Sequence, residues 1–130
     1  MKIKVTQIAF GILLLAGRAA AQDILTPSGQ AVSLFDVILD TDTDTARFRF
    51  LAPAIGPSDG AKPFEEVQGD FQWLCEMAAL PALAANDWHV DHLVISMSDR
   101  EIAFGSADET VVQYFEGFRL ADGACVWEVF

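Results

Sequence analysis

Basic residues are scarce in this sequence. The chain of 130 residues contains 19 Asp and Glu against 8 Lys and Arg, and its formal net charge is −11 at pH 7. Such a charge repels nucleic-acid phosphates and anionic lipid surfaces. The composition therefore argues against nucleic acid and membrane surfaces as partners, and leaves basic proteins, cations and neutral ligands.

Apolar runs long enough to cross a membrane are lacking at the N-terminus. The run at 8–17 is about half of the roughly 20 residues that a spanning helix needs. Lys2 and Lys4 precede it, and three alanines ending at Ala21 follow it, which is the pattern of a secretory signal peptide. We predict that residues 1–21 are removed and that the product is periplasmic or secreted, without membrane insertion.

The segment after the predicted cleavage site is short and more acidic than the whole chain. Three of the eight basic residues, Lys2, Lys4 and Arg18, lie before it, so residues 22–130 carry five basic and nineteen acidic side chains, a net charge of about −14. This length suits one small domain with a single modest core.

Cysteine is nearly absent. An exported chain with only Cys75 and Cys125 is expected to join them in a disulfide. Closing a loop of about 50 residues stabilises a domain by roughly 4 kcal/mol in the chain-entropy view. Neither cysteine belongs to a C-x-x-C pair or to a motif with a partnered histidine, which argues against a redox or nucleophilic role.

Catalytic motifs are missing as well. The sequence has no G-x-S-x-G, no H-E-x-x-H, no glycine-rich phosphate loop and no dinucleotide fingerprint. We therefore predict no catalytic residue and no cofactor, and lean against an enzyme.

The first half of the chain after the leader predicts a β-hairpin. Residues 31–39 are rich in β-branched and aromatic side chains, and residues 46–51 alternate polar and apolar. We expect Phe48 and Phe50 to face the core and Arg47 and Arg49 to face water. The Pro- and Gly-rich stretch 53–63 predicts a surface loop.

The clearest helix follows this loop. Apolar residues recur at helical spacing from Phe64 to Ala78, with Cys75 on the same face and two glutamates in the first turn. Pro81 is expected to interrupt it, with a short helical turn at 82–85.

The remaining elements are predicted to be strands. Residues 93–97 indicate a strand, 99–100 a turn, 101–104 a short returning strand, and 124–127 a last strand after a hairpin turn. Residues 107–118 fit a helix or a strand, and their aromatic and β-branched content favours strand. The predicted fold is α+β, an antiparallel sheet of about five or six strands with one main helix packed on one face.

Two acidic or histidine-bearing segments are candidate metal sites. Asp40, Asp42 and Asp44 have the spacing that opens a calcium loop, but Thr45 and Leu51 occupy its glycine and bidentate-glutamate positions, so we favour a hairpin turn.

The other segment contains both histidines of the chain. His89 and His92 lie among aspartates, residue types suited to zinc or acid–base chemistry. Their spacing of three suits a metal only on a helix, so we favour a polar start to the strand at residue 93.

Four segments, 33–40, 47–50, 95–100 and 122–128, together resemble an uncharacterised family of small exported bacterial proteins. The resemblance implies a single domain with a signal peptide and two cysteines, and no activity or ligand. We favour a non-enzymatic periplasmic or secreted interaction module whose partner is another envelope or secreted protein. The alternative is a small metal-dependent enzyme or a cation-binding domain.

Overall fold

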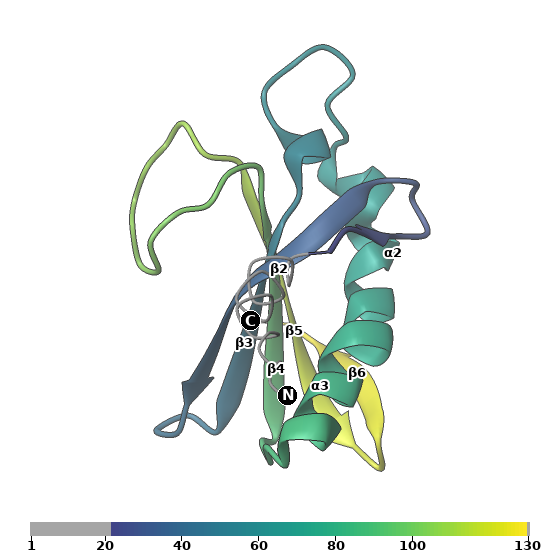
Figure 1. Cartoon of the computed structure of the whole chain (residues 1–130), viewed down its shortest axis with the longest axis vertical. Coiled ribbons are helices and arrows are strands. Elements are labelled where there is room, and N and C mark those ends of the chain that lie inside the picture. The colour runs from purple at the N-terminus through teal and green to yellow at the C-terminus, as the bar shows by residue number, and fades with distance from the viewer. Residues whose placement is uncertain (1–21, 130) are drawn as a thin grey trace, which may run out of the picture.

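The computed structural model describes residues 22–129, which form one six-stranded sheet with helices along one side (Figure 1). The predicted signal peptide lies outside the described residues. In chain order the elements are β1 (Ile24–Leu25), β2 (Ala31–Asp40), β3 (Thr45–Leu51), a 3-10 turn at Pro53–Ile55, α2 (Phe64–Leu74), a π-helical turn at Cys75–Ala79, α3 (Leu80–Asn86), β4 (His92–Ser98), β5 (Gln113–Ala121) and β6 (Ala124–Glu128).

The sheet is mixed, which corrects the purely antiparallel prediction. Its spatial order follows the sequence from β1 to β6, and all neighbours are antiparallel except β3 and β4, which run parallel. The physical reason is the helical segment between them. This crossover carries the chain from the end of β3 back to the end of the sheet where β3 began, so β4 runs in the same direction. The α+β class and the six strands agree with the prediction.

The helical crossover continues through Pro81 instead of stopping before it. Pro81 has no N–H to donate to a carbonyl one turn earlier, and the π-helical turn at Cys75–Ala79 lies just before α3. The wider turn accommodates the missing hydrogen bond without breaking the helix. In the described part of the chain, no helix is long and apolar enough to span a membrane.

The core lies between the helices and one face of the sheet. Phe48 and Phe50 are fully buried there, as predicted, and they pack with apolar residues of the neighbouring strands and of the helices. The other buried members with large side chains are Val32, Ile55, Val67, Phe71, Leu74, Leu83, Leu93, Ile95, Met97 and Phe118. We call this side of the sheet the inner face.

The segment between β4 and β5 is a loop over residues 99–112, so the returning strand predicted at 101–104 is wrong. Asp99 receives a hydrogen bond from the Val112 amide at its Oδ1, and its own amide donates to the Val112 carbonyl. These two bonds close the neck of the loop, and the residues between them have no strand to pair with. Strand β5 begins only at Gln113, which confirms a strand over the second half of the ambiguous stretch.

The disulfide joins Cys75 to Cys125, as predicted. It fastens the end of α2 to the edge strand β6. Gln72 strengthens the same junction, because its Nε2 donates to the Cys125 carbonyl over 2.8 Å.

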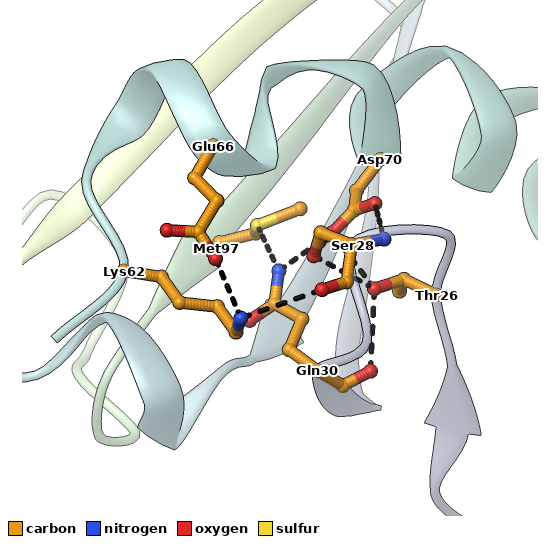
Figure 2. Close-up of polar contacts among 7 residues, drawn as sticks. All are labelled: Thr26, Ser28, Gln30, Lys62, Glu66, Asp70 and Met97. Carbon is orange, nitrogen blue, oxygen red and sulfur yellow. Dashed lines mark hydrogen bonds and ion pairs between the residues drawn. The ribbon is translucent and has the colours of Figure 1, made fainter. Parts of the chain in front are cut away.

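A buried polar cluster fixes the middle of α2 to the β1–β2 turn (Figure 2). Asp70 is 1% exposed, and its carboxylate accepts hydrogen bonds from the hydroxyls of Thr26 and Ser28, the Ser28 amide and the Gln30 side-chain amide. Lys62 adds a bond to the Ser28 carbonyl and an ion pair with Glu66. The helix is therefore held at its middle by Asp70 and at its C-terminal end by the disulfide.

Candidate functional site

The face of the sheet turned away from the helices, which we call the outer face, is the candidate binding surface. Strand alternation places Arg47 and Arg49 of β3, Ser96 of β4, and Phe115 and Gly117 of β5 on it. The loop 99–112 lies on this side of the sheet (Figure 1). The outer face therefore combines cationic and aromatic side chains.

Arg49 is the centre of this face, and the prediction that it points into water is wrong. Its side chain is only 7% exposed. Its Nη1 pairs with Asp36 over 2.8 Å, and its Nη2 donates to the Ile102 carbonyl over 2.7 Å. A guanidinium that bonds both a strand carboxylate and a loop carbonyl ties the loop to the sheet.

Two aromatic rings enclose the same guanidinium. Its carbon lies 4.9 Å from the ring centroid of Phe35 and 5.5 Å from that of Phe104. Arg47 also approaches Phe104, at 5.6 Å. These distances are in the range of cation–π attraction, so the two arginines hold the Phe104 ring in place on the loop.

A hollow of about 370 Å³ opens beside this arrangement. Its lining is formed by Phe35 and Asp36 of β2, Arg49 of β3, and residues 101–104 of the loop. Phe104 at its edge is 59% exposed, and Phe115 on the same face is 50% exposed. Exposed aromatic rings next to arginines are the residue types that dominate protein interfaces.

A second, smaller recess lies toward the other end of the outer face. Its lining includes Arg47, His92, Glu128 and Gly117, and Gly117 pairs with Val94 across the strands. Because Gly117 has no side chain, the outer face is recessed beside Val94, between the side chains of the neighbouring residues. The two recesses make the outer face uneven along its length.

The three aspartates proposed as a cation site lie at the β2–β3 turn. The Asp42 amide donates to Asp40 Oδ1 over 3.1 Å, and Asp44 has a left-handed backbone with φ of 52°. Asp40 also lies 3.9 Å from Arg47. This geometry is that of a turn in which a short acidic side chain satisfies a local amide.

The two histidines engage different carboxylates. His89 Nε2 lies 3.0 Å from Asp87 on an exposed turn, whereas His92 Nδ1 lies 3.1 Å from Glu128 of β6. Within residues 22–129, no three His, Cys, Asp or Glu side chains converge as a group that could hold a metal ion. His92, at the first position of β4, is the polar start of that strand.

Comparison with known families gives one match. Residues 11–130 match a family described as a family of unknown function, DUF6497. The chain belongs to this family. No curated protein and no solved structure matches the chain. The DUF6497 match covers all of the described fold, so both faces of the sheet belong to the family's domain.

Sequence reasoning did not find the Arg49 site. The alternation of residues 46–51 placed Arg49 correctly on the face opposite Phe48 and Phe50, but it could not show that a loop 50 residues later in the chain covers that face. One signal was available, namely the two arginines on one strand of a strongly acidic chain.

Proposed function

We propose that this DUF6497 protein is an exported, non-enzymatic binding module that docks another envelope or secreted protein on its outer face. The observation that carries the proposal is the enclosure of Arg49 by Phe35 and Phe104. It holds a half-exposed aromatic ring in a fixed position above a hollow. Pre-ordered aromatic side chains lose little conformational entropy when a partner covers them.

Export is the second part of this proposal. The Cys75–Cys125 disulfide is of the kind that persists in oxidising compartments, and the N-terminal sequence has the pattern of a leader. If residues 1–21 are removed as we propose, the intact mass of the native protein corresponds to a chain beginning at Gln22. A native chain that still begins at Met1 contradicts export by a cleaved signal.

Site-specific photo-crosslinking tests the docking surface. A photoreactive phenylalanine analogue is placed at Phe104 or at Phe115 of the oxidised protein in its native host. The control position is Met77, which is exposed on the helical crossover. We expect the same companion protein to be crosslinked from both outer-face positions and not from Met77.

The companion must also depend on the Phe104 ring. Phe104→Ala removes an exposed side chain, so we expect the fold to be kept and the companion's affinity to fall by about tenfold or more, as at an interface hot spot. Crosslinking from Met77 alone, or a companion that binds Phe104→Ala with unchanged affinity, contradicts docking on the outer face.

A further inference from the structure

A second hollow lies on the inner face, at the seam between α2 and the strands β5 and β6. Its volume is about 220 Å³. It is lined by Gln68, Phe71, Gln72, Glu116, Phe118 and Trp127. The disulfide and the Gln72 bond to the Cys125 carbonyl hold the helix and the edge strand together beside it. This hollow is separate from the outer face and does not depend on the function proposed above.

Glu116 is the unusual member of this lining. It pairs with Ile95 across the strands, so its side chain is on the inner face, and it is only 8% exposed. In the part of the chain that the structure describes, its carboxylate accepts one hydrogen bond, from the Trp127 indole to Oε1 over 2.8 Å, and has no cationic partner. The other carboxylate oxygen keeps access to the solvent of the hollow, where a cation can reach it.

The walls around this carboxylate suit a cation. Phe71, Phe118 and Trp127 contribute aromatic side chains, which attract ammonium and guanidinium groups and also pack against the alkyl chains that carry them. Trp127 is half-exposed, which keeps the hollow open to solvent. Residues 22–130 have a net charge of about −14, a field that concentrates cations at the surface.

The size of the hollow limits the ligand. A volume of about 220 Å³ is smaller than the roughly 300–1,000 Å³ of pockets for drug-sized molecules, and corresponds to a ligand the size of one long side chain. We propose that the hollow binds an alkyl chain ending in an ammonium group, with the charge on Glu116 and the chain among the aromatic rings. A lysine side chain of a basic protein and a small free amine share this chemistry.

Binding of n-butylammonium to the oxidised protein tests the proposal. The probe is titrated while the indole N–H resonances of the three tryptophans are followed by NMR, with neutral 1-butanol of the same chain length as the matched ligand. We expect a saturable shift at Trp127, none at Trp73 or Trp88, and binding at least about tenfold weaker for 1-butanol. Equal affinities for n-butylammonium and 1-butanol, or no saturable shift at Trp127, overturn the proposal, and this test uses the wild-type protein alone.

Two matched variants assign the effect to Glu116. Glu116→Gln keeps the shape and the acceptor for the Trp127 indole but removes the charge, and we expect it to weaken n-butylammonium binding by about tenfold or more. Glu65→Gln removes one charge from an exposed position of α2, the helix beside the hollow, and is expected to leave binding unchanged. Equal weakening by both variants overturns the proposal, because it means that only the overall charge attracts the probe.

A lysine-containing tripeptide separates the two sources. Binding of the tripeptide at least about tenfold tighter than n-butylammonium, with the same Trp127 shift, assigns the hollow to a partner's lysine. Equal affinities assign it to a free amine. A tripeptide that binds without shifting Trp127 contradicts recognition of the lysine side chain in this hollow.

Discussion

Asp70 has a hydrogen-bonding environment that suits an ionised carboxylate. All four groups that contact it are donors, two hydroxyls, one backbone amide and one side-chain amide. An ionised carboxylate accepts all of them, whereas an asparagine presents its own N–H₂ to some of them. The site therefore discriminates between two side chains of nearly identical shape.

This environment predicts the effect of Asp70→Asn. We expect the free energy of unfolding to fall by about 2–4 kcal/mol, because buried donors lose their acceptor. Urea unfolding followed by circular dichroism measures the change. Asp59→Asn, at an exposed position of the 53–63 loop, is the control and is expected to stay within about 0.5 kcal/mol of the wild type. Equal stabilities of the two variants would show that the Asp70 contacts contribute little.

Asp108 in the 99–112 loop predicts a pH-dependent effect. The Thr110 hydroxyl and the Thr110 amide donate to its carboxylate and lower the pKa of Asp108 below its usual value. A lowered pKa in the folded state stabilises the fold above the usual pKa, and this contribution is lost as the pH falls through the lowered pKa.

NMR titration of the Asp108 side-chain carboxyl measures this pKa. Thr110→Val removes the hydroxyl, the largest cause of the shift, and keeps the backbone amide, so the pKa of Asp108 should rise toward its ordinary value. Thr43→Val, in the β2–β3 turn, is the control and should leave it unchanged. A pKa that is the same in both variants would mean that the Thr110 hydroxyl does not bond the carboxylate in solution.

At the scale of single elements, the β5–β6 hairpin shows how a local sequence fixes strand pairing. Asp122 and Gly123 both have positive φ, 54° and 76°. A two-residue turn with both positions left-handed matches the right-handed twist of antiparallel strands, and Asp-Gly is a favoured pair for it. This turn was predictable because its geometry depends on two adjacent residues alone.

Two glycine substitutions should change stability in opposite directions. Gly123→Ala places a side chain at a φ of 76° and should cost about 1 kcal/mol, although its Cβ would meet no atom within 4 Å. Gly69→Ala, inside α2 and also free of contacts, should stabilise by about 0.5–1 kcal/mol because alanine favours the helix. Thermal unfolding of both variants decides this, and a shift of the same sign in both would contradict the backbone argument.

The helical crossover illustrates a limit of local reasoning. Proline was expected to interrupt the helix because it lacks an N–H, and that chemistry is correct. The outcome depended on packing, since Cys75 and Ala79 at the two ends of the π-helical turn are both fully buried against the sheet. Leu83, after Pro81, is buried as well, so tertiary contacts on both sides of the proline kept the helix in place while one turn widened.

At the scale of the whole molecule, the disulfide is the main covalent constraint. It closes a separation of 50 residues and joins the helical crossover to the last strand. The chain-entropy relation gives a contribution of about 4 kcal/mol for such a loop, a large part of the roughly 5–15 kcal/mol typical of a domain.

We therefore expect the double variant Cys75→Ala/Cys125→Ala to unfold at a much lower urea concentration, with about 4 kcal/mol less stability. Wild type reduced with dithiothreitol is the control and should lose a similar amount, because both treatments open the same loop. A double variant that matches the oxidised wild type would show that packing of the β6 edge against α2 needs no covalent link.

The sequence by itself determined the features that depend on near neighbours and on composition. The period of two at residues 46–51, the helical spacing from Phe64, the Asp-Gly turn and the count of two cysteines each specify one local outcome. Burial of Phe48 and Phe50 followed from the same alternation. The disulfide followed because, in a chain that is predicted to be exported, each of the two cysteines has only the other as an intramolecular partner for a disulfide.

Only the tertiary structure decided which segments far apart in the sequence meet. The parallel pairing of β3 with β4, the covering of Arg49 by the 99–112 loop and the burial of Glu116 beneath Trp127 each join residues whose own neighbours give no sign of the contact. The physical reason is that these contacts form when the whole core closes, since packing and desolvation depend on the position of every element at once.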